Sequence, residues 1–115
     1  MDSLKEVLLN KNFQSYICDE LINEFVDVSG RTKIRKYISE NRRSDTIKLM
    51  KMTGRQVVLK LKIVGGGDPK DFYLLSLAKQ IKAQYLITGD KGLLGLDPFT
   101  GTRILKYNEF IKLVN

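Results

Sequence analysis

The sequence predicts an α/β fold in which helices flank a mainly parallel sheet. Short β-prone segments alternate along the chain with segments whose apolar residues recur at spacings of three and four. The intervening helices favour parallel pairing, because parallel strands need a crossover connection. The chain has 115 residues, 43% of them hydrophobic, which fits one globular domain over residues 1–115.

The first half of the chain is expected to be mainly helical. Ser3, Asp19 and Ser44 are expected to cap helices, because their side-chain oxygens can accept the free N–H groups of a first turn. Gly30 and Gly54 are expected to end helices. The predicted elements are a helix over residues 3–11, a strand over 13–18, a helix over 19–30, a helix over 32–39 and a helix over 44–54.

The second half is expected to supply the remaining strands. Residues 57–64 follow the pattern of a strand. Apolar side chains at every second position, from Val57 to Ile63, alternate with Val58, Lys60 and Lys62. Asp68 followed by Pro69 is a strong helix start, since Asp caps and Pro suits the first helical position. The further predicted elements are a strand over 84–88, a turn at Gly89 and Asp90, a loop over 93–99, a strand over 103–106 and a helix over 108–114.

The formal charge of +7 is concentrated in one part of the chain. Between Arg31 and Lys62 there are eleven Lys or Arg and only two acids, whereas the rest is slightly acidic. Such a block suits a polyanion such as RNA or an acidic partner protein, and it also suits the solvated faces of ordinary helices. The candidate nucleic-acid-binding residues are Arg35, Lys36, Arg42, Arg43, Lys48 and Lys51.

The residue types exclude several chemistries. With no histidine and one cysteine, Cys18, the chain has no Ser-His-Asp triad, no Cys-His pair and no usual zinc ligand set. Carboxylates with a hard cation, Mg²⁺ or Mn²⁺, remain the plausible catalytic route. A single cysteine, no membrane-length apolar run and no signal-peptide pattern predict a cytoplasmic protein.

Three acids are candidate metal ligands, because open α/β sheets bind ligands at the carboxyl ends of their strands. Asp90 directly follows a predicted strand. Asp71 is expected on the inward face of its helix, and Glu24 borders the apolar stripe of an earlier helix. Converging carboxylates repel each other unless a divalent cation lies between them. Each residue also has a structural reading: a helix-start acid for Asp71, a turn residue for Asp90 and a solvated acid for Glu24.

Several motifs resemble one known family. DPKD, LLSLA, YLITGDKGLL and RILKYNEF follow one another between Asp68 and Val114, and YICDELINEFVDVSGRTKIRKYI precedes them. Together they are similar to the strands and helices of PIN-domain proteins, in the group of toxin components of toxin–antitoxin pairs. The resemblance implies an endoribonuclease that uses Mg²⁺ or Mn²⁺, with Glu24, Asp71 and Asp90 as ligands, Thr88 as a supporting hydroxyl, and a cognate antitoxin as partner.

The sequence departs from this family in two places. The family opens with a strand ending in Asp-Thr-Asn, which supplies its first metal-binding aspartate, and no such strand precedes residues 3–11. Gly92 also stands where a further acid is common. The missing central strand predicts two half-sheets whose edges pair directly, are covered by a second chain or leave the fold destabilised. We therefore expect a tendency to dimerise or to aggregate.

Three functional hypotheses therefore stay open. The first is a PIN-like endoribonuclease whose activity is weak or lost. The second is a non-catalytic remnant that binds RNA or an antitoxin. The third is an α/β domain of another kind, such as a receiver-like signalling domain, in which Asp19 and Glu20 would form the acidic pair at the end of the first strand.

Overall fold

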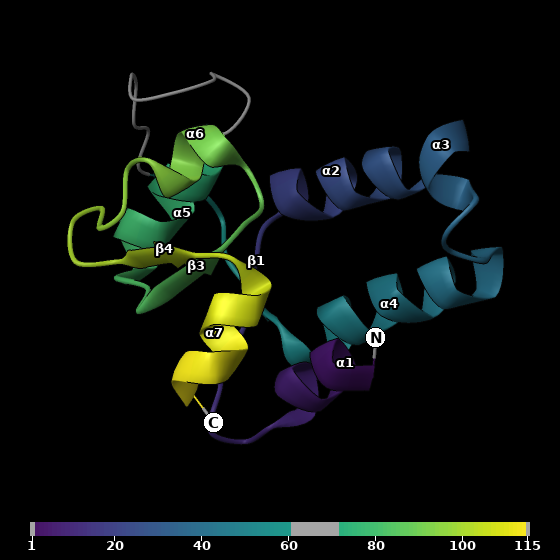
Figure 1. Cartoon of the computed structure of the whole chain (residues 1–115), viewed down its shortest axis with the longest axis horizontal. Helices are drawn as coiled ribbons and strands as arrows, with labels where there is room; N and C mark the ends of the chain where they lie inside the picture. The colour runs from purple at the N-terminus through teal and green to yellow at the C-terminus, as the bar shows by residue number, and fades with distance from the viewer. Residues whose placement is uncertain (1, 61–71, 115) are drawn as a thin grey trace. The chain divides into compact units, whose positions relative to one another are not determined.

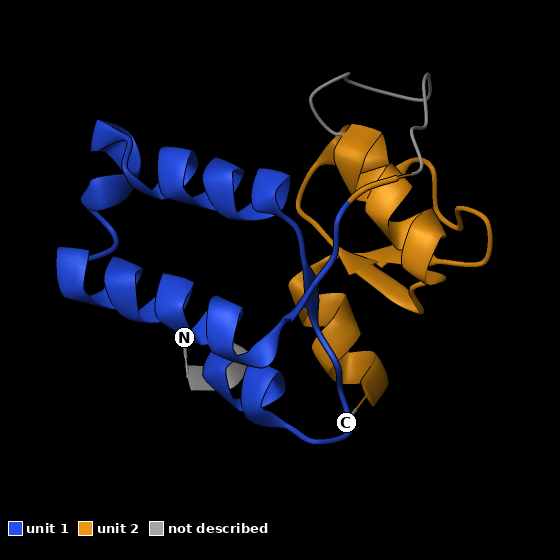
Figure 2. Cartoon of the chain, turned by 180° about the vertical axis from the view of Figure 1, so that it is seen from behind, with its two compact units in different colours: residues 1–58 blue, residues 59–115 orange. Residues whose placement is uncertain are grey.

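The computed structural model describes residues 2–60 and 72–114. The chain forms two compact units, residues 1–58 and residues 59–115, shown in different colours in Figure 2. Each unit contains helices and one sheet of two short parallel strands (Figure 1). The predicted α/β class with parallel pairing is thus confirmed. A single domain over the whole chain stays a prediction.

Unit 1 consists of helices around one short strand pair. β1 and β2 are parallel, with Tyr16 opposite Arg55, and the amide of Val57 extends the ladder by donating to the carbonyl of Ile17 at 2.8 Å. Helices α2 and α4 lie side by side and run in opposite directions, and α1 contacts α4 (Figure 1). The elements are α1 (Asp2–Leu9), β1 (Tyr16–Ile17), α2 (Asp19–Ser29), α3 (Thr32–Arg35), α4 (Glu40–Thr53) and β2 (Arg55–Gln56).

Three predicted helix starts in unit 1 are wrong. Helix α1 begins at Asp2, so Ser3 lies inside it rather than capping it. Helix α4 begins at Glu40, because the hydroxyl of Ser39 accepts the amide of Arg42 at 3.2 Å and caps the helix there. Ser44 therefore lies inside α4, and the preceding helix is shortened to α3. Asp19 is the first residue of α2 rather than its cap, and its carboxylate accepts the amide group of Gln56 at 3.1 Å. Gly30 and Gly54 follow their helices as predicted.

The absence of a side chain at Gly54 lets the chain pass from α4 into β2 close to β1. A Cβ atom at this position would lie 2.8 Å from Cγ2 of Ile17 and 2.7 Å from the carbonyl oxygen of Met50. Ile17 and the neighbouring Cys18 are buried, so the close approach packs the start of β2 against the core of the unit. Burial raises the pKa of the Cys18 thiol above its ordinary value of 9.0.

Unit 2 is a two-stranded sheet between helices. β3 and β4 are parallel, with Tyr85 opposite Arg103. Leu75, Leu93 and Ile104 form the buried core with α5 and α6, whereas Tyr85 packs edge-on against Phe110 of α7 at a ring distance of 5.3 Å. Because neighbouring strand residues face opposite sides, α7 covers the other face (Figure 1). The elements are α5 (Phe72–Ile81), β3 (Tyr85–Ile87), α6 (Lys91–Leu94), β4 (Arg103–Leu105) and α7 (Tyr107–Val114).

The predicted strand over residues 57–64 is wrong in its described part. Only Arg55 and Gln56 are in a strand, and the ladder ends with the hydrogen bond of the Val57 amide, so residues 58–60 lie outside it. The amide of Lys60 instead donates to the side-chain oxygen of Gln80 at 2.7 Å, so a helix side chain replaces a strand partner. Residues 61–64, together with the predicted helix start at Asp68 and Pro69, lie outside the described residues.

The segment after β3 also differs from the prediction. Residues 93–99 were expected to be a loop, but α6 occupies Lys91–Leu94 because Asp90 caps it. In the described ranges 2–60 and 72–114, no helix is both long and apolar enough to cross a membrane.

Candidate active site

Asp90 lies three residues after the end of β3 and caps α6. One carboxylate oxygen, Oδ2, accepts the amide of Leu93 at 2.9 Å, which satisfies a free donor of the first helical turn. The side chain is exposed, and the other oxygen, Oδ1, takes no hydrogen bond from the described residues. Asp90 is therefore fixed by its cap and still presents one carboxylate oxygen at the carboxyl end of a parallel strand.

The hydroxyl of Thr88 contacts Asp90 through the main chain. Thr88 Oγ1 accepts the backbone amide of Asp90 at 3.1 Å, and the amide of Thr88 donates to the carbonyl of Leu105 at 2.9 Å. This links the loop that carries Asp90 to the neighbouring strand. A Cβ at Gly92 would lie 3.1 Å from Asp90 Oδ2, so a side chain at that position would be next to the carboxylate.

Of the other two predicted ligands, Glu24 is among the described residues and Asp71 is not. Glu24 is on the exposed side of α2, whose buried residues are Ile22 and Ser29. Asp71 lies just before α5 and outside the described residues. Glu24 belongs to unit 1 and Asp90 to unit 2. The sharing of one ion by these three acids stays a prediction.

The described residues contain no group of three or more Asp, Glu, His or Cys side chains that could hold a metal ion. The donor chemistry at Asp90 nevertheless suits a hard cation, because an exposed carboxylate oxygen on a fixed loop is the ligand type that Mg²⁺ and Mn²⁺ prefer. Asp19 and Glu20 lie in the first turn of α2, where acids complement the helix dipole, and Asp19 accepts from Gln56.

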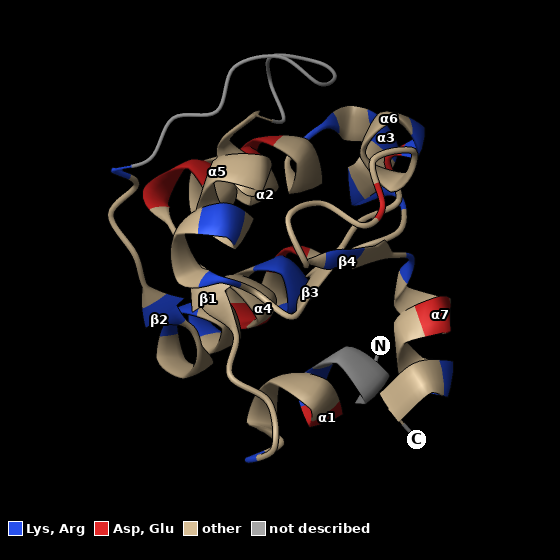
Figure 3. Cartoon of the chain, turned by 90° about the vertical axis from the view of Figure 1, so that its left-hand side faces the viewer, with Lys and Arg blue, Asp and Glu red and all other residues tan. Residues whose placement is uncertain are grey.

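The candidate RNA-binding residues on α3 and α4 do not form one face. Figure 3 shows basic and acidic segments interspersed along the helices. Lys48 and Lys51 share the outward side of α4, because positions three residues apart lie only about 60° apart around the helix axis. Arg42 is about 180° from Lys51 on the same helix. All three are exposed, and none forms an ion pair with a described residue.

Arg43 is used inside unit 1. Its guanidinium donates to the hydroxyl of Ser29 at 2.8 Å and to the carbonyl of Val26 at 2.7 Å, and it pairs with Glu40 at 3.2 Å. The side chain is only 17% exposed. Arg43 thus joins α4 to the C-terminal end of α2, a contact between residues fourteen positions apart. Arg35 also pairs with Glu40, at 3.2 Å, while Lys36 is exposed.

Sequence reasoning did not single out a second group of polar residues, in unit 2. Lys79, Lys82, Thr100 and Gly101 line an open hollow beside Ala83. The signal that identifies them is backbone conformation: Lys82 and Thr100 have φ values of 54° and 45°, which non-glycine residues seldom adopt. Neither spacing nor composition reveals such a conformation.

Comparison with known proteins gives one finding at the family level. The model of a family described as PIN domain matches residues 2–92, which is most of the chain and includes Glu24, Asp71, Thr88 and Asp90. No curated protein and no solved structure gave a match.

Proposed function

Because the chain belongs to the PIN-domain family, whose members are generally nucleases, we propose that it is a metal-dependent endoribonuclease and the toxin of a toxin–antitoxin pair. The observation that carries this proposal is the family match over residues that include Asp90, an exposed aspartate that caps α6 at the carboxyl end of β3. Ligands of open α/β folds bind at this end of the strands.

We assign Asp90, Asp71 and Glu24 to the binding of one or two divalent cations. A bound Mg²⁺ or Mn²⁺ supplies positive charge that activates water and offsets the charge developing on a phosphodiester. Asp90 would contribute its Oδ1 oxygen, because Oδ2 accepts the Leu93 amide. Thr88 would keep the loop in place through its bond to the Asp90 amide.

The substrate in this proposal is RNA, held by exposed basic residues of unit 1. Lys36, Arg42, Lys48 and Lys51 are suited to phosphate contacts, because none of them forms an ion pair with a described residue. The proposed protein partner is a cognate antitoxin, and the proposed compartment is the cytoplasm. Association of two copies through a free strand edge is a further proposal, which size-exclusion chromatography with light scattering tests directly.

The test is RNA cleavage in the presence of Mn²⁺ by the wild-type chain and an Asp90→Asn variant. Asparagine caps a helix as well as aspartate does, so this change removes the charge and keeps the fold. We expect cleavage to fall by at least about 10- to 100-fold, the loss seen even for residues that only support a metal ligand. Asp71→Asn and Glu24→Gln are expected to have the same effect. Glu6→Gln, an exposed acid on α1, is the matched control and is expected to retain activity.

Equal rates for wild type and Asp90→Asn would reject the assigned site. Salt-sensitive RNA binding by the wild type, with no cleavage in Mn²⁺ or Mg²⁺, would instead identify the chain as a non-catalytic binding module. Chelation by EDTA separates the two cases, because it abolishes metal-dependent cleavage and leaves electrostatic binding intact.

A further inference from the structure

A hollow of about 490 Å³ lies beside β4 in unit 2. Its lining comes from α6, from the loop before β4, from β4 itself and from the first turn of α7. The lining residues that follow β4 place one end of the hollow at the carboxyl end of this strand. Asp90 follows β3 at the same end of the sheet, because the two strands are parallel.

The outer edge of β4 carries the backbone groups of Ile104 and Lys106. Successive residues of a strand bond to opposite edges, and the first and third residues of β4 bond to β3. The outward amide of Ile104 donates to Oδ1 of Asp97 at 2.7 Å. The outward amide of Lys106 donates to Oε1 of Glu109 at 3.1 Å. Both carboxylates are therefore anchored beside one strand edge, on amides about 7 Å apart.

One acceptor on this edge has no partner among the described residues. The carbonyl of Ile104 lies between the two outward amides and takes no hydrogen bond from a described residue, whereas the carbonyl of Lys106 accepts the amide of Phe110 at 3.0 Å. Ile104 is only 2% exposed and lines the hollow. A buried carbonyl without a partner costs free energy, so this group points to a ligand or to an ordered water.

A single water and the local roles of the two acids do not account for the hollow. One water occupies about 30 Å³, whereas the hollow is far larger. Glu109 caps the first turn of α7 through Oε1, but its Oε2 takes no hydrogen bond from a described residue. The side chain is exposed. Two acceptors, the Ile104 carbonyl and Glu109 Oε2, are therefore left at one strand edge.

The charges of the lining residues cancel. Asp97 and Glu109 are balanced by Arg103 and Lys106, and Asp97 pairs with Arg103 at 3.1 Å. This balance favours a neutral hydrogen-bonding ligand over a phosphate or a metal ion, which would need an excess of the opposite charge. An added strand is also disfavoured, because both outward amides already have carboxylate acceptors.

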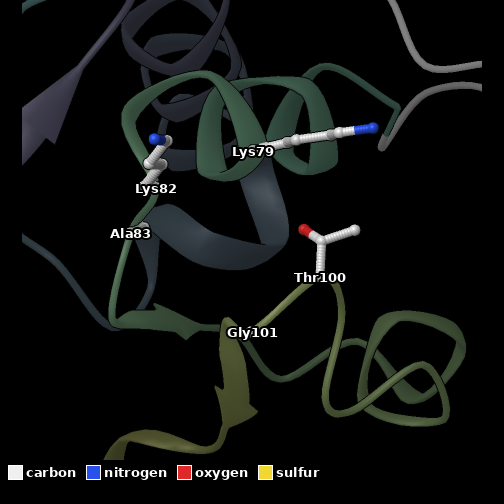
Figure 4. A pocket seen from close by; sticks show the side chains of 5 residues that line it. All are labelled: Lys79, Lys82, Ala83, Thr100 and Gly101. Carbon is white, nitrogen blue, oxygen red and sulfur yellow. The ribbon is translucent and has the colours of Figure 1, made fainter.

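The other hollow of unit 2, beside Ala83, has no such convergence. Lys79 and Lys82 line it and point away from each other (Figure 4). The acceptors beside β4 differ, because hydrogen bonds to neighbouring amides of one strand fix where both carboxylates lie. Of these two hollows, only the one beside β4 has groups whose positions define the ligand they would bind.

We propose that the hollow beside β4 binds a guanine base of single-stranded RNA. The proposal rests on RNA being the substrate, as proposed above, and adds which base the chain selects. On its Watson–Crick edge guanine has two adjacent donors, N1–H and the N2 amino group, whereas each other base has only one. The Ile104 carbonyl and Glu109 Oε2 are the acceptors for this pair.

The remaining lining groups fit the same ligand. The side chain of Asn108 is exposed, lines the hollow and forms no hydrogen bond with a described residue, so its amide group can donate to O6 of guanine. Leu94 and Leu105 add apolar lining for the faces of the ring. Bases that are read outside a stack are held by this combination of polar edge contacts and apolar packing.

The first test is titration of the full chain with GMP, IMP, AMP, CMP and UMP in EDTA, followed by amide NMR. All of these nucleotides carry the same phosphate, so differences in affinity report the base. We expect GMP to bind about tenfold more tightly than AMP, CMP or UMP, the order of discrimination of a bidentate pair. IMP lacks the N2 amino group and is expected to bind more weakly than GMP. The largest shifts are expected at Leu105, Lys106 and Glu109.

Glu109→Gln tests the acceptor without removing the helix cap. Glutamine also caps from the third position of a helix, and its amide group then replaces the free acceptor by a donor. We expect a nearly unchanged Tm and loss of the preference for GMP over AMP. Glu6→Gln, with the same change in charge, is the matched control and is expected to keep the preference. Asn108→Ala is expected to lower the affinity for GMP several-fold.

Three results would overturn the proposal. The first is equal affinity of the wild type for GMP, IMP and AMP, which needs no variant and decides the question even if Glu109→Gln fails to fold. The second is an unchanged preference for GMP in a folded Glu109→Gln. The third is a shift of the same amides by Mg²⁺, in the absence of EDTA and nucleotide, at a lower concentration than GMP requires. That outcome would identify a cation site.

These outcomes are separable from the proposed nuclease activity. Nucleotide binding is measured without a divalent cation, and the variants leave Asp90, Asp71 and Glu24 unchanged. A chain that selects GMP and cleaves no RNA keeps this proposal and loses the nuclease. In a chain that cleaves, replacing one guanosine of a single-stranded substrate by inosine is expected to slow cleavage by the wild type and not by Glu109→Gln. Equal rates on both substrates for the wild type would overturn the base assignment and leave the nuclease intact.

Discussion

Asp90 combines a structural contact with a free acceptor. Its Oδ2 oxygen accepts the Leu93 amide at 2.9 Å, and its Oδ1 oxygen accepts no hydrogen bond from the described residues. A carboxylate in this arrangement loses little conformational freedom when it binds a cation, because the helix already fixes its rotamer. Asparagine preserves the cap and removes the charge, which makes residue 90 a position where stability and metal binding can be measured separately.

Introduction of an acid at Gly92 is expected to strengthen metal binding. A Cβ there would be 3.1 Å from Asp90 Oδ2, so the carboxylate of Gly92→Asp would lie near that of Asp90. Two neighbouring carboxylates repel each other, and we expect the Tm to fall without metal and to recover with Mn²⁺. Thermal unfolding with and without Mn²⁺ measures both effects. Gly92→Asn controls for size, and an equal response of the two variants to Mn²⁺ would contradict the prediction.

Arg43 is expected to stabilise the fold rather than to hold RNA. Arg43→Met keeps the apolar stem and removes the donors to Ser29 and Val26. Loss of these charged hydrogen bonds is expected to lower the free energy of unfolding by about 2 kcal/mol, as measured by urea denaturation. Arg42→Met, at an exposed neighbouring position, is expected to change it by less than about 0.5 kcal/mol. Similar losses in both variants would argue against the helix–helix contact.

At the level of elements, side-chain contacts compensate for short strands. β1 and β2 each have two residues, and β3 and β4 each have three. A two-stranded pair of this length is marginal alone, so packing against helices must supply most of its stability. Asp97 illustrates this in unit 2. Its Oδ1 accepts the amide of Ile104 at 2.7 Å and the guanidinium of Arg103 at 3.1 Å, and so anchors β4 from the preceding loop.

The contacts of Asp97 predict an acid-sensitive unit 2. The hydrogen bond from the Ile104 amide, and then the Arg103 side chain, hold the pKa of Asp97 below its ordinary value of 3.8. A lowered folded-state pKa contributes stability that is complete above the unfolded value and is lost as the pH falls through the folded value. We expect Asp97→Asn to have a lower Tm than the wild type at neutral pH. Its Tm should also fall less than that of the wild type when the pH is lowered below about 4. Parallel Tm–pH curves for both proteins would contradict this role.

At the level of the whole molecule, charge is the feature most relevant to RNA. The net charge of +7 gives a long-range attraction to polyanions that salt screens. How much this charge contributes to specific contacts with RNA depends on which basic side chains are not already engaged within the fold. Arg35 and Arg43 are engaged with Glu40, whereas Lys48 and Lys51 share the outward side of α4.

Neutralising the outward side of α4 is expected to reduce the salt dependence of RNA binding. For Lys48→Gln/Lys51→Gln, the slope of log affinity against log salt should fall by about 1.4, at about 0.7 per phosphate contact with a single strand. The stability of the fold should not change, because neither side chain is engaged in an ion pair with a described residue. Lys5→Gln/Lys11→Gln is the control with the same change in net charge. Equal slopes in the two variants would mean that only total charge matters.

The sequence by itself determined the α/β class, parallel pairing, the helix ends at Gly30 and Gly54, and the family. These properties depend on apolar spacing, caps and motifs that lie within a few residues of one another, as with Gly30 after α2 and Gly54 after α4. The start of α4 was missed because two serines, Ser39 and Ser44, are equally good caps in sequence, and only the folded chain shows which one meets a free amide.

The tertiary structure alone decided which side chains are free. Arg43 and Lys48 look alike in sequence, but Arg43 reaches Ser29 fourteen residues away and Lys48 faces solvent. Likewise, the hydrogen bond from Lys60 to Gln80 sets where β2 ends. The hydrogen bond from Thr102 to Ala83 sets the hollow beside Thr100. Local sequence cannot specify such contacts, because each forms only when segments far apart in the chain pack together and remove each other's water.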